Sequence, residues 1–108
     1  MTISPTQKAA IEEVFEAVLE VTQGGRYKRR LSSIFLDLPP RADWEDYYEV
    51  IPQPRSLNGV QTKLQEDGYK TCLDVLNDLN LVFMNALHYN EDGSQISQDA
   101  EKLMVRIT

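Results

Sequence analysis

The sequence predicts an all-α fold in which four helices pack as a bundle. Three observations support this prediction. Apolar side chains recur at the three- and four-residue spacing of one helix face in four separate segments. A serine or threonine that can cap a helix stands before each of these segments. No segment shows the alternation of apolar and polar residues that indicates a strand.

The first helix is predicted over residues 5–23. Ser4 can cap its start, and Pro5 suits the first helical position because no backbone donor is needed there. The glycine pair at residues 24–25 ends or interrupts it. Its apolar face consists of Ile11, Val14, Phe15, Val18 and Leu19.

A long irregular connection is expected from Pro39 to Arg55, and it holds four of the five prolines. Each proline fixes φ, so the segment can keep a shape without regular structure. Asp43 is expected to cap one short helical turn through Tyr48. Loops of this length in a small domain are usually functional. A shorter helical turn is expected just before it, from the spacing of Leu31, Ile34, Phe35 and Leu38.

Three further helices complete the predicted bundle. Ser56 is expected to cap a helix to about Glu66, and Thr71 to cap a helix over roughly residues 72–89. The latter is apolar nearly all round and is therefore expected to be central. Its apolar residues are Leu73, Val75, Leu76, Leu79, Val82, Phe83 and Leu87. A turn over residues 90–94 leads to a last helix, capped by Ser94, with the stripe Ile96, Ala100, Leu103 and Ile107.

Length and charge bound the class of protein. At 108 residues the chain is expected to be one domain, residues 1–108. A net charge of −6 favours a basic partner, and direct DNA contact is not expected. No apolar stretch reaches the roughly 20 residues of a membrane span. One basic cluster is interpreted as solvated charges near a helix end, with a phosphate contact as the alternative: Arg26, Lys28, Arg29 and Arg30.

The chain offers little for catalysis or metal binding. Cys72 and His88 are the obvious nucleophile and base, but they lie 16 residues apart on one predicted helix, about 24 Å. One histidine and one cysteine cannot make a zinc site, and residues 90–93 lack the ligand spacing of a calcium loop. No enzyme, metal or cofactor is therefore expected.

A series of motifs runs along nearly the whole chain. It comprises FLDLPPRADWEDYYEVIPQP (residues 35–54), SL (56–57), GY (68–69), ND (77–78), VFMNALHYN (82–90) and S-x-x-x-x-D-A-x-x-L (94–103). In this order the motifs resemble the bromodomain family, the readers of acetylated lysine. The compact loop and the sequence DYYEVIPQP look most like those of polybromo-type modules and fungal chromatin-remodeller tandem bromodomains.

The resemblance implies a left-handed four-helix bundle with a long loop after the first helix and a short loop between the last two. It implies that Asn90 donates its side-chain amide to the acetyl carbonyl, and that Tyr47 reaches this carbonyl through an ordered water. Taken alone, Asn90 would be interpreted as a helix C-cap. The other implied pocket residues are Phe35, Leu38 and Pro39 in the loop wall, Trp44 at the rim, Ile96 opposite, and Ala86 and Tyr89 at the floor and side.

The implied function is non-catalytic recognition of acetylated lysine on a histone tail. The module would act as a monomer in the nucleus, beside other subunits of a chromatin-remodelling or transcription-regulating complex and away from membranes. The alternative is a degenerate bromodomain that docks a neighbouring protein without binding acetyl-lysine. One departure from the family pattern is Arg55, which stands where a methionine is usual, and it bears on peptide preference.

Overall fold

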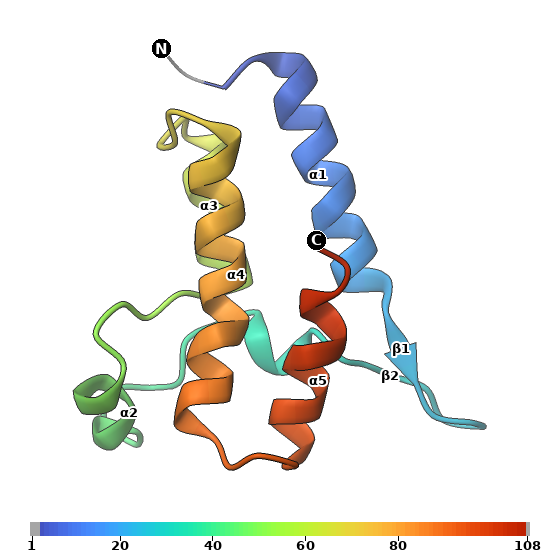
Figure 1. Cartoon of the computed structure of the whole chain (residues 1–108), viewed down its shortest axis with the longest axis vertical. Coiled ribbons are helices and arrows are strands. Elements are labelled where there is room, and N and C mark those ends of the chain that lie inside the picture. Colours follow the sequence, from blue (N-terminus) through green and yellow to red (C-terminus); the bar gives the residue numbers. More distant parts are fainter. Residues whose placement is uncertain (1–2, 108) are drawn as a thin grey trace.

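The computed structural model describes residues 3–107, in which four long helices form a bundle (Figure 1). This confirms the predicted fold class. The long helices are α1 (Pro5–Glu20), α3 (Leu57–Gln65), α4 (Cys72–Tyr89) and α5 (Gln95–Met104). The connection from α1 to α3 contains strands β1 (Thr22–Gln23) and β2 (Arg29–Arg30), a 3-10 turn η1 (Ser33–Phe35) and the short helix α2 (Glu45–Val50).

All four long helices begin at the serine or threonine that was expected to cap them. The Ser4 hydroxyl accepts from the Gln7 backbone N–H at 3.2 Å, and the Gln7 side chain accepts from the Ser4 N–H at 3.2 Å. This reciprocal capping box satisfies two backbone donors that have no partner inside the helix. The other three caps, at Ser56, Thr71 and Ser94, each accept from the N–H three residues on.

Helix α4 is the central element, and it packs against α1, α3 and α5. Val75, Leu79 and Phe83 lie at 0% exposure on the face it turns to the core. The prediction that this helix is central is confirmed, but Leu73, one of its apolar residues, is 65% exposed rather than buried. Leu73 lies two residues before Val75, or about 200° around the helix, so it points away from this buried face.

The first helix is three residues shorter than predicted, because the chain leaves it to form a hairpin. Thr22 pairs with Arg30 and Gln23 with Arg29 in an antiparallel ladder that the sequence did not indicate. Strands of two residues are too short to show alternation. The reversal uses Gly24 at φ +121°, where a Cβ atom would lie 2.6 Å from the Tyr27 carbonyl oxygen.

Two smaller predictions, on the cap of α2 and on the end of the last helix, were wrong. Asp43 does not cap α2, whose N-cap residue is Trp44 and which has no side-chain cap. The last helix ends at Met104, and Ile107 packs on the core from a turn beyond it.

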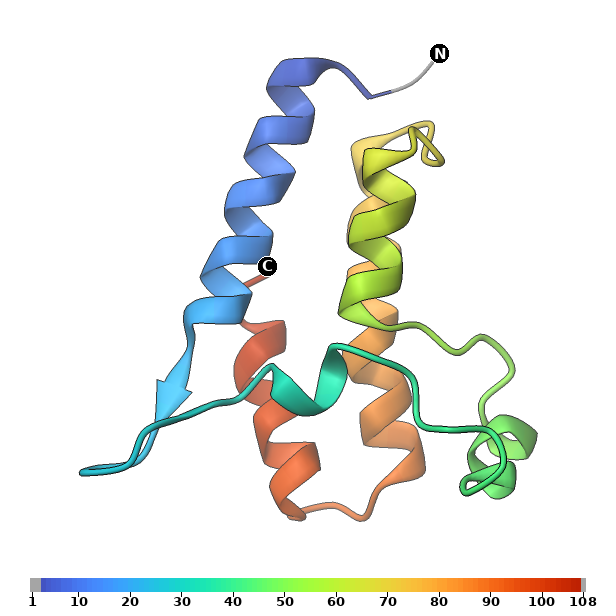
Figure 2. The same cartoon turned by 180° about the vertical axis from the view of Figure 1, so that it is seen from behind.

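The hairpin and α2 project on opposite sides of the bundle, near the end where α4 turns into α5 (Figures 1 and 2). The connection between α1 and α3 therefore crosses the whole width of the molecule at this end. In the described part of the chain, no helix combines the length and apolar character that crossing a membrane requires.

Candidate ligand-binding site

A cavity of about 270 Å³ lies between the long connection and the adjoining ends of α4 and α5. Its volume lies just below the range of about 300 to 1,000 Å³ that is typical of ligand pockets. The structure brings together around it all nine residues singled out from the sequence: Phe35, Leu38, Pro39, Trp44, Tyr47, Ala86, Tyr89, Asn90 and Ile96. What these residues bind stays a prediction.

The wall formed by the connection is built on the core of the bundle. Phe35 is 7% exposed, and its ring meets that of Phe83 edge to face, with the centroids 5.1 Å apart. Edge-to-face packing of this kind adds to simple burial. Further along, Leu38 and Trp44 are 40% and 48% exposed, so they form the rim rather than the floor.

Hydrogen bonds to backbone carbonyls hold the rest of the connection in place. The Tyr48 hydroxyl donates to the Pro39 carbonyl, and the Arg41 guanidinium lies 4.0 Å above the Tyr48 ring. On the other side of α2, the buried Asn85 side chain of α4 donates to the Gln53 carbonyl at 2.8 Å. The prolines thus stiffen a segment that α4 also anchors.

Tyr47 stands at the centre of an aromatic group on one side of the cavity. Its ring centroid lies 4.9 Å from that of Tyr89 and 5.4 Å from that of Tyr48, both edge to face. Partial burial raises the pKa of Tyr47, and the two neighbouring tyrosines raise it further. The hydroxyl therefore stays protonated at neutral pH, and it bonds to no atom of residues 3–107.

Asn90 ends α4 at the cavity and uses part of its amide there. Its side-chain Nδ2 donates to the Ala86 carbonyl at 3.0 Å, and its backbone N–H donates to the same oxygen at 3.0 Å. The interpretation as a C-cap is thus confirmed, although φ −95° and ψ 156° are extended rather than left-handed. An amide NH₂ carries two donors. The second has no partner within the described residues.

Five residues that line the cavity were not among the predicted pocket residues, and Arg55 is the most informative. Its Nε lies 3.2 Å from an Asp78 carboxylate oxygen, and the other oxygen accepts from the Tyr69 hydroxyl at 2.7 Å. The departure from the family motif at this position was the available signal. The full set is Ile34, Asp37, Pro40, Arg55 and Val82.

The charged and reactive residues around the site stay apart from one another. Five acidic residues close in sequence to the site residues are all exposed, and none of them is among the residues that line the cavity: Asp43, Glu45, Asp46, Glu91 and Asp92. His88 is exposed near the end of α4, and Cys72 is half-buried at its start. Within residues 3–107, no group of three histidine, cysteine or acidic residues is arranged to hold a metal ion.

Comparison with known proteins bears on this geometry. The model of the family described as Bromodomain matches residues 15–102. The chromatin structure-remodeling complex subunit rsc4 of Schizosaccharomyces pombe is 36% identical over 94 residues, 86% of this chain and 17% of that protein. The nuclear protein STH1/NPS1 of Saccharomyces cerevisiae is 37% identical over 101 residues, 94% of this chain and 7% of that protein. The chain thus spans less than a fifth of either relative.

Solved structures agree with the fold. The acetylated tandem bromodomain of Rsc4 matches with a TM-score of 0.89 at 23% identity, over 98% of this chain and 42% of that one. The bromodomain of human BAZ1A matches with a TM-score of 0.77 at 23% identity, over 92% of this chain and 85% of that one. At this identity the likeness concerns the fold alone. The resemblance noted from the motifs is confirmed by the family match.

Proposed function

This chain belongs to the bromodomain family, and we propose that its cavity binds the acetylated side chain of a lysine on a histone tail. Residues 1–108 would form one bromodomain that acts as a monomer without catalysis. Its partners would be the acetylated tail and other subunits of a chromatin-remodelling or transcription-regulating complex in the nucleus. The relatives named as a remodelling subunit and a nuclear protein support this setting.

The observation that carries the proposal is the remaining Asn90 N–H beside a small, mostly apolar cavity. Acetylation removes the charge of a lysine and leaves an amide on an apolar stem. An unpaired ammonium would pay a large desolvation penalty in such a cavity, so unmodified lysine is rejected. The acetyl carbonyl needs one donor, and an asparagine supplies it without adding a charge.

The bond from Asn90 to the Ala86 carbonyl supports this role rather than opposing it. The bond occupies one N–H and fixes the plane of the amide, so the second N–H keeps one direction. A donor that is already oriented loses less conformational freedom when a ligand arrives. The protonated Tyr47 hydroxyl lines the same cavity and can hold a bridging water against the same carbonyl.

Simple magnitudes indicate weak binding by a single site. Burying about five carbons of the stem and methyl group is worth roughly 4 kcal/mol. The hydrogen bond adds about 1 kcal/mol, whereas association costs about 4 to 15 kcal/mol. Useful affinity would therefore come from linkage to other readers in one complex. The exposed acidic residues close in sequence to the site residues add attraction for the basic residues that flank the modified lysine.

The proposal is tested by calorimetric titration with singly acetylated and unmodified histone-tail peptides. We expect binding only of acetylated peptides, a loss of at least about tenfold in Asn90→Ala, and no loss in Asn77→Ala. Asn77 is a matched control because it is an exposed asparagine on the same helix. Asn90→Ala also removes the C-cap of α4, so the free energy of unfolding should fall by about 1 kcal/mol.

Titrations are therefore compared at a temperature where every variant is fully folded. Equal binding of acetylated and unmodified peptides by the wild type would contradict the reader. That result would favour the alternative, a degenerate module that docks a neighbouring protein.

A further inference from the structure

The hairpin on the far side of the bundle from α2 is the most basic part of the chain. Residues 24–30 hold four of the 11 cationic side chains and none of the 17 acidic ones. The other seven cationic side chains leave the rest of the chain with a net charge of −10. A net charge averaged over 108 residues hides this separation.

The cationic side chains of the hairpin do not all have the same surroundings. Arg29 of β2 forms two parallel hydrogen bonds of 2.9 Å to the Asp99 carboxylate of α5, so it was wrongly interpreted as a solvated charge. Successive side chains of a strand point to opposite faces. With Arg29 facing α5, its neighbours Lys28 and Arg30 point away from the bundle, and both are exposed.

Side-chain contacts fix the hairpin to α5 at both strands. Asp99 is 3% exposed and also accepts from the Gln95 side chain at 2.9 Å. On the other strand, the Gln23 side-chain oxygen accepts from Lys102 at 2.6 Å. The exposed cations of the hairpin are therefore presented on a fixed support, which lowers the entropy lost when a partner binds.

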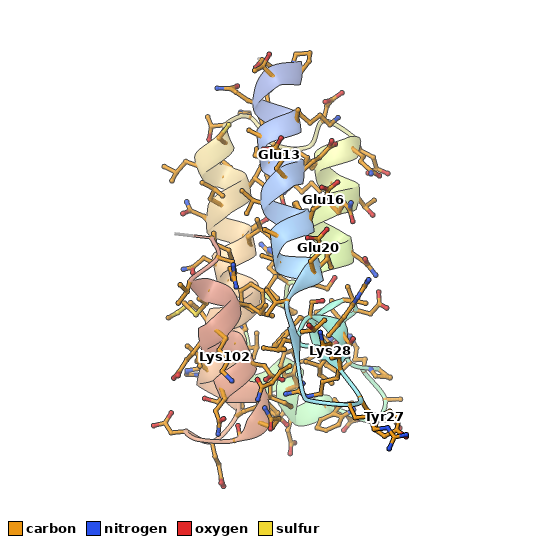
Figure 3. The ribbon with its side chains drawn as sticks, turned by 90° about the vertical axis from the view of Figure 1, so that its right-hand side faces the viewer. Glu13, Glu16, Glu20, Tyr27, Lys28 and Lys102 are labelled. Atoms are coloured by element: carbon orange, nitrogen blue, oxygen red, sulfur yellow. The ribbon has the colours of Figure 1, made fainter. Side chains whose placement is uncertain are left out.

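The tip of the hairpin carries an aromatic side chain that packs on nothing in the core. Tyr27 is 84% exposed, and the Arg26 guanidinium lies 5.8 Å from its ring centre. Figure 3 shows Tyr27 at the outer end of the hairpin, whereas Glu13, Glu16 and Glu20 lie along α1. The basic tip and the acidic helix are thus separate regions of one side of the molecule.

We propose that Arg26, Lys28 and Arg30, with Tyr27 between them, contact the phosphate backbone of double-stranded DNA. Lysine, arginine and tyrosine side chains are common donors to phosphate oxygens. Lys28 directly precedes β2 and Arg30 ends it, so an extended backbone holds these two cations about 6.6 Å apart. A two-stranded ribbon also fits against a duplex groove.

The charge of the remaining surface favours a duplex over a flexible acidic peptide. The rest of the chain repels a polyanion, so only the projecting tip can approach one. A duplex is rigid enough to touch the tip without meeting the acidic face of α1, whereas a flexible peptide gains less from a row of fixed cations. Three phosphate contacts make the binding weak, free of sequence preference and sensitive to salt.

The test measures fluorescence anisotropy of a labelled duplex of about 20 base pairs over a range of salt concentrations. For the wild type, log affinity should fall against log salt with a slope of about −2.7, since each neutralised phosphate contributes about −0.9. The variant R26Q/K28Q/R30Q should lose at least about tenfold in affinity at low salt, with a slope close to zero. Unchanged affinity and slope in this variant would overturn the proposal.

Two control variants separate the contribution of the hairpin from that of the remaining surface. The variant K8Q/K63Q/K70Q has the same net charge as R26Q/K28Q/R30Q, but it alters lysines at the opposite end of the bundle. It should therefore bind the duplex as the wild type does. Asn90→Ala should also keep duplex binding, which separates this inference from the proposal for the cavity. A glutamate-rich peptide of matched charge that displaces the duplex as well as unlabelled duplex does would assign the hairpin to a protein partner and overturn the proposal.

Discussion

The two projections of the connection between α1 and α3 differ in what they present. The segment around α2 turns aromatic and aliphatic side chains onto a cavity, and its acidic residues Asp43, Glu45 and Asp46 are exposed. The hairpin of β1 and β2 buries no side chain and presents cations on a fixed ribbon. One connection thus carries an apolar cavity wall beside α2 and a set of exposed cations on the hairpin, which lies on the opposite side of the bundle (Figure 2).

The interactions that anchor the two projections to the bundle also differ in charge. Neutral hydrogen bonds to the Gln53 and Pro39 carbonyls hold the cavity side. On the hairpin side, the ion pair between Arg29 and Asp99 acts together with the bond from Lys102 to Gln23. Neutral bonds respond little to pH or salt, whereas a carboxylate pair is lost when the carboxylate is protonated. We therefore expect acid to weaken the anchor between Arg29 and Asp99 while the bonds to the Gln53 and Pro39 carbonyls persist.

The largest effect is expected from Asn85→Ala, which removes the anchor of the cavity side. Asn85 is 6% exposed, and its substitution leaves the Gln53 carbonyl without its donor. The shorter side chain also leaves a small void beside α4. We expect a loss of about 2 kcal/mol in the free energy of unfolding, measured by urea denaturation. Asn77→Ala on the exposed side of α4 should change it by less than about 0.5 kcal/mol.

Weaker binding of acetylated peptides should accompany this loss, because the wall of the cavity is no longer held. Equal stability of the Asn85 and Asn77 variants would show that the connection is held by its prolines and core contacts alone.

The sequence was sufficient for the helices and insufficient for the hairpin, and the reason lies in the range of the interactions. Ser56 and Thr71 act on N–H groups three residues away, so a local pattern predicts where α3 and α4 begin. The pair of Arg29 and Asp99 joins residues 70 positions apart. No local spacing contains it, and two-residue strands add no periodicity.

The second largest effect is expected from Asp99→Asn, which weakens the anchor of the hairpin. The hydrogen bond from Arg29 lowers the pKa of Asp99 below its ordinary value, although burial raises it. A lowered pKa in the folded state means that the stability is present above about pH 3.9 and is lost as pH falls through the folded pKa. The variant should melt a few degrees lower than the wild type at pH 6, and the difference should shrink as the pH falls through the folded-state pKa of Asp99.

Asp74→Asn provides the matched control, because Asp74 is an exposed carboxylate near the start of α4. Its melting temperature should follow that of the wild type more closely at pH 6. A difference between wild type and Asp99→Asn that persists unchanged to acid pH would contradict the role assigned to the charged anchor.

The cavity shows a similar division between what the motifs indicated and what only the fold reveals. The motif order placed Asn90 and Tyr47 among the site residues, and both line the cavity. Local sequence did not reveal that one Asn90 N–H is bonded to Ala86, because that depends on the side-chain rotamer. Nor did it show the pairing of Arg55 with Asp78, 23 residues away.

The smallest expected effect lies within the cavity wall itself. Tyr47→Phe removes a hydroxyl that bonds to no atom of residues 3–107, and it keeps the ring packed on Tyr89. Stability should therefore stay unchanged, while affinity for acetylated peptide falls about fivefold with the loss of one water-mediated bond. Tyr48→Phe differs in its effect on stability, because its hydroxyl holds the Pro39 carbonyl, and about 1 kcal/mol of stability should be lost.

Calorimetry and thermal melting on both variants distinguish these outcomes. Because burial raises the pKa of Tyr47 above its ordinary value of 10.0, its hydroxyl remains a donor from pH 6 to 9, and its contribution to affinity should be constant over this range. If Tyr47→Phe lowers stability and leaves peptide affinity intact, this hydroxyl serves the fold and the proposed water contact is wrong.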